Sequence, residues 1–320
     1  MEFGLALPQG AHRDLRRDVA DVATAAEQAG YAGLWAYERV LFPLHPANGL
    51  YGIDGLPWPN YYRHCADPLT VLTLAGAVTG RIRLGTSVLV APLHGKLQLA
   101  RALATLDQAT GGGRVAVGLG SGWSADEYEA SGAGFARRGQ ALDEVIDALR
   151  ALAAPDLVTY LDSQITIREA IVSPKPVTRI PVLLGGGFTK RAICRIAEKA
   201  DGWLPSSLPG PVMAGTWKQI LGLAEDAGRD PAALRLVPLA PFVSVTAKPL
   251  GTGRQQFQGS PRELAEDFAD MAEAGAHELI IGLDADSVSA SELIDKALTL
   301  IDAATAAGLR EPTARSAAGT

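Results

Sequence analysis

The sequence contains few of the features that mark disulfide-rich, metal-binding or membrane proteins. Cysteine occurs twice in 320 residues, at Cys65 and Cys194, and this wide separation fits neither a disulfide framework nor a metal-ligand spacing. No apolar run approaches the roughly 20 residues that cross a bilayer. The opening segment EFGLALP lacks the basic and apolar parts of a signal peptide. We therefore expect a cytoplasmic protein with two reduced thiols, no metal site and no membrane partner.

Positive charge is also scarce. The chain carries 29 Lys and Arg against 35 Asp and Glu, a net charge of −6 at pH 7, so it lacks the basic field that neutralises the phosphates of nucleic acids. It contains no serine–histidine–acid spacing, P-loop or metal-ligand cluster. These absences argue against nucleic-acid binding, hydrolysis and metal chemistry. They favour a small-molecule substrate and a cofactor that performs the difficult chemical step.

A repeating βα pattern runs through the chain, whose 48% of hydrophobic residues can bury a large core. Short β-rich segments alternate with amphipathic helical patterns at intervals of about 30 to 45 residues, as in the βα units of a parallel sheet. No low-complexity linker divides the chain, so we favour one domain over two. The predicted fold class is α/β, a TIM (β/α)8 barrel over residues 1–308, followed by a disordered tail at 309–320. The eight candidate strands are Phe3–Leu7, Gly33–Tyr37, Ile82–Val90, Arg114–Leu119, Pro181–Leu184, Gly202–Pro205, Leu234–Val245 and His277–Gly282.

Three long segments interrupt this pattern after the second, fourth and seventh strands, and we predict that they are insertions that carry specificity. The first is Val40–Ala66. The second, Leu157–Thr178, contains the β-rich VTYLDSQITI and predicts a small hairpin, whereas the polar, glycine-rich Lys248–Gly259 predicts a mobile lid. The first segment carries side chains that we predict to contact a substrate, although they can equally pack the loop onto the barrel: Trp58, Tyr61 and His64.

Small residues end the third and fourth strands, at the edge where α/β barrels hold their chemistry. The absence of side-chain bulk there would let a flat ring system lie against the backbone, with peptide groups as its hydrogen-bonding partners. The alternative explanation is a pair of tight turns. The small residues are Gly85, Ser87, Gly118, Gly120, Ser121 and Gly122.

A run of three glycines, Gly185, Gly186 and Gly187, separates the fifth strand from a helical pattern. The free N–H groups and the dipole at a helix start form an anion site, so the run fits a phosphate. An ordinary glycine-rich turn fits equally well. A Rossmann site explains the run less well because the GxGxxG pattern is missing.

Charged residues lie near the ends of the second and third strands. Glu38 and Arg39 can position a substrate or cofactor there, and a mutual ion pair is the alternative. His94, just beyond the third strand, is a weaker catalytic candidate that an ordinary loop position would explain. Ser124 and Glu127 have the spacing of a helix capping box, so we assign both a structural role.

Motifs in this order along almost the whole chain resemble the luciferase-like flavin-dependent oxidoreductase family, especially its deazaflavin (coenzyme F-420, or F420) branch. The motifs are GYAGLWAYERV, RIRLGTSVLV, LARALATLDQATGGGR, VGLGSGW, FARRGQALDE, SPKPV, PVLLGGG and ADGW. The resemblance implies a TIM barrel that binds a flavin or deazaflavin at the carboxyl ends of its strands, and a homodimer. It also implies a non-proline cis peptide at Ser87–Val88, behind the central ring of the cofactor.

The resemblance also assigns roles to individual residues. Glu38 matches an acidic residue that approaches the deazaflavin, whereas Arg39 stands where many relatives carry an active-site histidine. This departure leaves Glu38, or a tyrosine or histidine of the Val40–Ala66 segment, to replace that histidine in proton transfer. Related flavin mononucleotide (FMN) monooxygenases often hold the phosphate with an arginine where this chain has Gly120 and Ser121, which favours deazaflavin here. The implied cofactor contacts are Glu38, Thr86, Ser87, Val88, Gly120, Ser121, Gly185, Gly186 and Gly187.

The resulting hypothesis is hydride transfer between coenzyme F420 and a small organic substrate, with Glu38 and Arg39 as the catalytic candidates. A reduced-FMN-dependent monooxygenase of the same fold is the first alternative. A non-catalytic flavin-binding barrel is the second, because Arg39 replaces the expected histidine. The sequence identifies neither the substrate nor the direction of hydride transfer.

Overall fold

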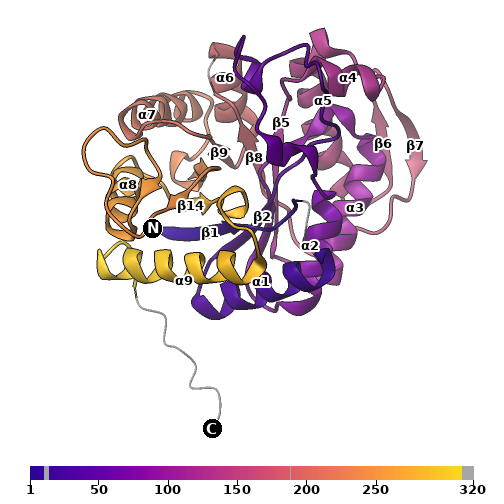
Figure 1. Ribbon diagram of the computed structural model, residues 1–320. Coiled ribbons are helices and arrows are strands. Elements are labelled where there is room, and N and C mark those ends of the chain that lie inside the picture. Colours follow the sequence, from indigo (N-terminus) through magenta and orange to yellow (C-terminus); the bar gives the residue numbers. More distant parts are fainter. Residues whose placement is uncertain (11–13, 188, 312–320) are drawn as a thin grey trace.

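The computed structural model describes residues 1–10, 14–187 and 189–311. Strands and helices alternate along the chain, and the strands form a curled parallel sheet with helices around it (Figure 1). Each of the eight predicted strand segments overlaps at least one strand of the structure. The strands of this sheet are β1 (Glu2–Ala6), β2 (Gly33–Ala36), β3 (Arg83–Thr86), β4 (Leu89–Val90), β5 (Val115–Gly120), β8 (Val182–Gly185), β9 (Gly202–Leu204), β10 (Arg235–Leu236), β11 (Leu239–Ala240) and β14 (Glu278–Ile281).

The sheet curls back on itself through the segment that holds β10 and β11. Its strands follow the order β10-β9-β8-β5-β3-β2-β1-β14-β11, and β4 also pairs with β5. Between β10 and β11, Val237 N donates to Trp203 O (2.9 Å), and Pro238 O accepts from Ile280 N (2.9 Å). This segment therefore bonds to β9 on one side and to β14 on the other. The prediction of an α/β fold with a TIM-like parallel sheet is confirmed.

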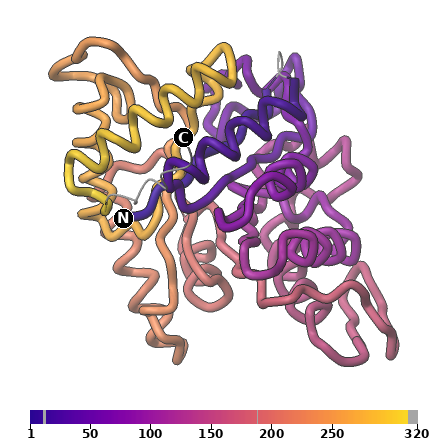
Figure 2. The backbone as a smooth tube through the Cα atoms, turned by 90° about the horizontal axis from the view of Figure 1, so that it is seen from below, coloured from indigo at the N-terminus to yellow at the C-terminus, as the bar shows by residue number. Residues whose placement is uncertain are grey.

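Helices pack on the outside of the sheet, and the views in Figures 1 and 2 agree that α1 and α9 lie side by side. Local signals explain several helix starts. Ser260 and Glu263 form a capping box, and Asp67 accepts a hydrogen bond from Thr70 N at the start of α2. Within the described residues, no helix combines the length and apolar character needed to cross a membrane. The α-helices are α1 (Leu15–Ala29), α2 (Pro68–Val78), α3 (Lys96–Ala109), α4 (Ala125–Ala130), α5 (Arg138–Ala153), α6 (Lys190–Lys199), α7 (Gly210–Asp226), α8 (Pro261–Glu273) and α9 (Ala290–Ala306).

The buried indole of Trp35 fills the inside of the sheet near the amino ends of its strands. A Cβ atom at Gly4, Gly33 or Gly85 would lie 2.4–2.7 Å from this side chain, so these glycines make room for it. Trp35 Nε1 donates to Glu278 Oε1 (2.9 Å), and the other oxygen of that carboxylate pairs with Arg83 at 2.6 Å. The interpretation of Gly85 as part of an open cofactor surface is therefore wrong, because the position is closed by core packing.

Two of the three long segments contain further strands. An antiparallel hairpin of β6 (Val158–Leu161) and β7 (Thr166–Ala170) confirms the hairpin expected between the fourth and fifth strands. In the third segment, β13 (Gln258–Gly259) pairs with β12 (Ser244–Val245). Glu263 also accepts hydrogen bonds from Leu250 N and Gly251 N. These contacts fasten that segment to α8, and its mobility stays a prediction, as does the role of the three segments as insertions.

The chain outside the main sheet also includes six short 3-10 helices within the described residues, and most of the predicted tail falls on 312–320, outside them. The 3-10 helices are η1 (Leu50–Gly52), η2 (Asn60–Arg63), η3 (Ala91–Leu93), η4 (Phe135–Arg137), η5 (Pro231–Ala233) and η6 (Asp284–Asp286).

Candidate functional site

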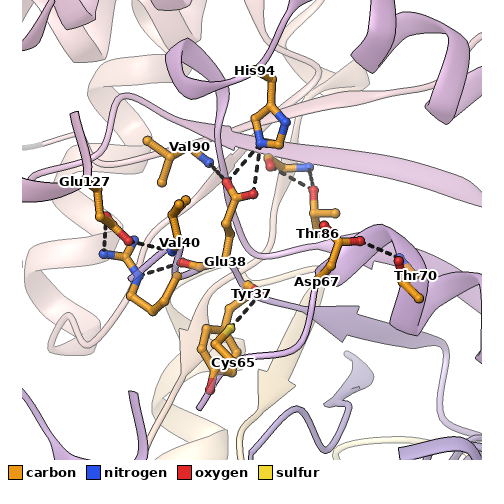
Figure 3. A network of polar contacts seen from close by, with 12 residues as sticks. Tyr37, Glu38, Val40, Cys65, Asp67, Thr70, Thr86, Val90, His94 and Glu127 are labelled. Atoms are coloured by element: carbon orange, nitrogen blue, oxygen red, sulfur yellow. Dashed lines mark hydrogen bonds and ion pairs between the residues drawn. The ribbon is translucent and has the colours of Figure 1, made fainter. Parts of the chain in front are cut away.

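Glu38 and His94 form a hydrogen-bonded pair at the carboxyl edge of the sheet, where the parallel strands end (Figure 3). Glu38 follows β2 and its side chain is 6% exposed, whereas His94 follows η3 and is 24% exposed. His94 Nε2 lies 2.9 Å from Glu38 Oε1 and 3.1 Å from Oε2. Val90 N also donates to Glu38 Oε2 at 2.6 Å. The carboxylate therefore joins the end of β2 to the segment that leads from β4 into α3.

The pKa of His94 is raised above its ordinary value. Burial of the ring opposes its protonation, but the hydrogen bond from the ring to Glu38 and the negative charges of Glu38 and Asp67 outweigh this effect. The pair thus makes the ring easier to protonate than a free imidazole, and a histidine beside a carboxylate is an arrangement that can exchange protons.

Arg39 points away from this pair and toward α4. Its Nη1 lies 2.9 Å from Glu127 Oε2, and the two side chains are 9% and 1% exposed. Glu127 Oε1 accepts from Val40 N at 2.8 Å. The guanidinium also lies over the rings of Trp123 and Tyr62, at 5.0 and 5.8 Å from their centroids. The alternative of a mutual Glu38–Arg39 ion pair is therefore wrong, because each side chain has a different charged partner.

The prediction for Ser124 and Glu127 is half confirmed. Ser124 Oγ accepts from Glu127 N at 3.2 Å, as a helix cap should. The carboxylate of Glu127, however, turns to Arg39 and Val40 instead of returning to the backbone of Ser124. Burial raises the pKa of Glu127, and the nearby guanidinium opposes that rise without cancelling it. Glu127 thus fastens the segment after β2 to the start of α4.

The peptide bond between Ser87 and Val88 is cis, as the resemblance predicts. Val88 is partly exposed at the carboxyl edge and packs against the inner cluster that contains Trp35. A Cβ at Gly120 would lie 2.8 Å from Val88 Cγ2, and one at Gly185 would lie 3.2 Å from Cγ1. The two glycines therefore let the Val88 side chain sit between the ends of β5 and β8.

The other predicted cofactor contacts near the cis peptide are engaged with the backbone. Thr86 is 1% exposed, and its hydroxyl exchanges hydrogen bonds with the N–H and C=O of Gly118. Ser87 is 6% exposed, and its N–H donates to Ala36 O. Ser121 O accepts from the hydroxyl of Tyr128 at 2.6 Å. These contacts hold the strand ends together. A ligand at this region would therefore meet mainly backbone, because the Thr86 hydroxyl is already bonded to Gly118.

The glycine run after β8 adopts backbone conformations that favour glycine. Gly186 and Gly187 have φ of 93° and 109°, and a Cβ at Gly187 would lie 2.7 Å from the indole nitrogen of Trp203. That nitrogen donates to Gly186 O at 2.7 Å. Around Gly186 a Cβ would meet open space. The run leads to the start of α6, where Thr189 Oγ1 accepts from Ala192 N.

Aromatic side chains of the Val40–Ala66 segment lie across the carboxyl edge. The ring centroid of Trp58 is 4.6 Å from that of Trp123, which follows β5, and Tyr61 is 5.6 Å from Phe242, which follows β11. Trp58 is 7% exposed and donates to Asn48 O at 2.9 Å. This tryptophan therefore packs the loop.

The remaining predicted substrate contacts are more accessible. Tyr61 is half-buried and His64 is exposed. Burial, and then the neighbouring Tyr62, raise the pKa of Tyr61, so its phenol stays neutral at ordinary pH. Substrate contacts by Trp58, Tyr61 and His64 stay predictions.

A cavity of about 360 Å³ lies away from the carboxyl edge, between α3, α5 and the segment 172–182. Its lining includes Leu103, Leu149, Leu152, Val172 and Val177. It shares no residue with the Glu38–His94 pair or with the glycine run. Among the residues that the structure describes, no His, Cys, Asp or Glu cluster is arranged to hold a metal ion.

Sequence reasoning missed the partnership between Glu38 and His94 and the binding of Arg39 by Glu127. These pairs join residues 56 and 88 positions apart. The sequence did hint that these residues lie near one another. All four follow predicted strands, and the ends of parallel strands meet at one edge of the sheet.

Comparison with known proteins identifies relatives over most of the chain. The model of the luciferase-like monooxygenase family matches residues 1–250. The Mycobacterium tuberculosis protein Rv0953c is 34% identical over 274 residues, which covers 81% of this chain and 93% of that protein. The F420-dependent glucose-6-phosphate dehydrogenase of Amycolatopsis mediterranei is 27% identical over 199 residues, covering 61% of this chain and 54% of that enzyme.

The solved structures confirm the fold. Monooxygenase RslO1 from Streptomyces bottropensis superimposes with a TM-score of 0.79, at 19% identity, over 94% of this chain and 98% of that one. The family match covers more than half of the chain, and it agrees with the cis peptide, the curled parallel sheet and the order of the motifs. The chain therefore belongs to the luciferase-like monooxygenase family.

Proposed function

We propose that this protein transfers a hydride between coenzyme F420 and a small organic substrate. The observation that carries the proposal is the surface at the carboxyl edge, where the cis segment and Val88 meet the glycine ends of β5 and β8. Membership of a family with F420-dependent members supports it. A flat ring system needs such a surface of backbone and small side chains.

The residues present fit the parts of a deazaflavin. Val88 and Gly185 would lie behind the ring, because both are partly exposed at the carboxyl edge, and the buried Gly120 makes room for the Val88 side chain. Gly186, around which a Cβ would meet open space, and the N–H groups at the start of α6 would hold the phosphate. No arginine stands at Gly120 or Ser121, where related FMN monooxygenases hold theirs, and this favours the deazaflavin.

The bound deazaflavin would supply the hydride chemistry, and the protein would supply geometry and charge. Glu38 is fixed by Val90 N and His94, so its charge has a defined position at the edge. Arg39 is a poor proton donor because a guanidinium stays protonated in proteins and this one is paired with Glu127. The Val40–Ala66 segment would cover the reacting groups and limit access of water.

Titration of the purified protein with oxidised F420 and, separately, with FMN tests the cofactor. We expect quenching of tryptophan fluorescence at lower concentrations of F420 than of FMN, followed by oxidation of reduced F420 in the presence of a suitable acceptor. Tight binding of FMN alone would overturn the assignment.

A reduced-FMN-dependent monooxygenase is the second candidate, and the family description supports it. Such an enzyme consumes oxygen in proportion to turnover, whereas the proposed reaction proceeds without oxygen. An oxygen electrode therefore separates the two. A non-catalytic barrel is the third candidate, and loss of turnover in Glu38→Gln with unchanged cofactor binding argues against it.

A homodimer and a cytoplasmic location belong to the same proposal. Light scattering coupled to size-exclusion chromatography tests the first, with a mass of twice the 33.4 kDa chain as the expected result.

A further inference from the structure

The Glu38–His94 pair combines a fixed carboxylate with an accessible imidazole. Glu38 is nearly buried and bonded to the backbone, whereas about a quarter of the His94 side chain is exposed. The contacts of the ring with Glu38 use Nε2 (Figure 3). Among the described residues Nδ1 makes no hydrogen bond, so it is the nitrogen left for a substrate or for water. A ring with one nitrogen held by a carboxylate and the other unbonded is suited to passing protons.

The position of the pair brings it close to the surface proposed for the cofactor ring. The Glu38 carboxylate is 2.6 Å from Val90 N, and Val90 lies two residues after Val88. His94 follows the same segment after the single turn of η3. The pair thus borders the cis segment that would lie behind the ring.

The charges around His94 leave it under the influence of acids. Glu38 faces it from the end of β2, and Asp67 acts on it from the start of α2. The nearby cations are engaged elsewhere, because Lys96 pairs with Glu144 and Asp162, while Arg39 pairs with Glu127. Repulsion by an unpaired cation would lower the proton affinity of the ring, and both of these cations are paired with carboxylates.

We propose that His94, oriented by Glu38, is the proton donor and acceptor of this site, and that its substrates are small carbonyl compounds and the corresponding alcohols. The inference rests on the proposed hydride transfer and extends it to a substrate class. A hydride delivered to a carbonyl carbon leaves negative charge on oxygen, so the site needs an acid beside that oxygen. The other groups considered at this edge are poorer acids, because Arg39 stays protonated and the half-buried phenol of Tyr61 has a raised pKa.

Carbonyl reduction at this pair conserves atoms and charge. A hydride leaves the reduced cofactor and forms a C–H bond at the carbonyl carbon, while the π electrons of the C=O bond move to oxygen. His94 Nδ1–H gives its proton to that oxygen and the ring becomes neutral, still donating from Nε2 to Glu38. Water then returns a proton to Nδ1. Alcohol oxidation follows the same path in reverse.

The first part of the test needs neither cofactor nor substrate. The ring of His94 is titrated by ¹H–¹⁵N NMR in the wild type and in the Glu38→Gln variant. We expect the wild-type pKa to lie above the ordinary value of about 6.5, and the pKa of the variant to fall to or below that value. Identical titration of His94 in both proteins overturns the proposal, because the pairing on which it depends would be absent.

The second part measures turnover with reduced F420 and a panel of small aldehydes and ketones. His94→Gln retains a hydrogen-bonding group toward Glu38 but cannot titrate near neutral pH. We expect its kcat to fall about 10²–10⁴-fold, with an F420 Kd unchanged within a factor of about two and with loss of the pH-dependent limb assigned to His94. His277→Gln is the matched control and keeps the wild-type kcat, because this exposed histidine precedes β14 at the opposite, amino end of the strands.

The outcomes separate this inference from the proposed function. A wild type that binds no F420 overturns the proposed function and this inference with it. Turnover of carbonyls with an undiminished kcat in His94→Gln overturns this inference alone. Oxidation of reduced F420 by other acceptors, with no carbonyl accepted, overturns the substrate class and leaves hydride transfer standing.

Discussion

Replacement of Arg39 by methionine tests the buried ion pair that fastens the Val40–Ala66 segment to α4. Arg39 and Glu127 are 9% and 1% exposed and lie 2.9 Å apart. Methionine keeps most of the apolar stem but leaves the carboxylate of Glu127 with Val40 N as its remaining contact among those described above. An uncompensated buried charge costs about 3–5 kcal/mol, and loss of the guanidinium over Trp123 adds about 0.5–2 kcal/mol.

Glu127→Gln should lower the free energy of unfolding by less than Arg39→Met does, because its amide oxygen can still accept a hydrogen bond from Val40 N. We expect about 1–3 kcal/mol for this variant, the usual effect of leaving a buried charged group with a neutral partner. The double variant Arg39→Met/Glu127→Gln removes both charges, so it should be more stable than Arg39→Met alone. The expected coupling free energy between the two residues is about 0.5–3 kcal/mol.

The pH dependence follows from the raised pKa of Glu127. A carboxyl group whose pKa is raised on folding contributes stability that is fully present below its unfolded value of 4.5 and is lost as pH rises through the folded value. Removal of Arg39 raises that pKa further. The free energy of unfolding of Arg39→Met should therefore approach that of the wild type as pH falls toward the unfolded value of 4.5.

Urea unfolding monitored by tryptophan fluorescence, with limited proteolysis of the Val40–Ala66 segment, measures these differences. Glu129→Gln, on the exposed side of α4, is the matched control and should change stability by less than about 0.5 kcal/mol. A loss below about 1 kcal/mol in Arg39→Met at pH 8, or a double variant less stable than that single variant, would refute the reasoning.

Two further substitutions test other parts of the molecule. Lys96→Met removes a buried ammonium that lies 2.6 Å from Asp162, and should lower the free energy of unfolding by about 3 kcal/mol in thermal or urea unfolding near neutral pH. Although burial alone would raise it, Lys96 and two backbone amides hold the pKa of Asp162 at about 2, so the difference from wild type should shrink as pH falls from the unfolded value of 3.8 toward 2. Gly120→Ala places a Cβ 2.8 Å from the Val88 side chain, so equilibrium titration should show weaker F420 binding with little change in the far-ultraviolet circular dichroism spectrum. An unchanged Kd would contradict the assignment of this surface to the cofactor.

Local patterns in the sequence predicted the strands because a buried parallel strand is a short apolar run between turn residues. Leu34, Val117 and Leu184 lie in such runs and are buried in β2, β5 and β8. The break in the seventh strand at Pro238 could also have been predicted from the sequence, because proline cannot donate a hydrogen bond to a neighbouring strand. Which strands then pair on either side of the break depends on both neighbours and could not be predicted without the tertiary structure.

Side-chain partnerships at the site were less predictable. Gly85 and Gly120 look equivalent in sequence, but one makes room for the buried Trp35 and the other for Val88 at the carboxyl edge. Glu38 and Arg39 are adjacent in the chain and turn to partners on different elements. Propensity and periodicity describe a residue's own segment, whereas these contacts depend on which strand ends meet.

The filled amino end of the sheet has a kinetic consequence. Trp35 and Glu278, each 1% exposed, occupy the interior at that end. Under the proposed function, cofactor and substrate would therefore both enter and leave over the carboxyl edge, across which aromatic residues of the Val40–Ala66 segment lie. With one shared entrance, the molecule bound deeper would bind first and dissociate last, and movement of this segment would limit product release.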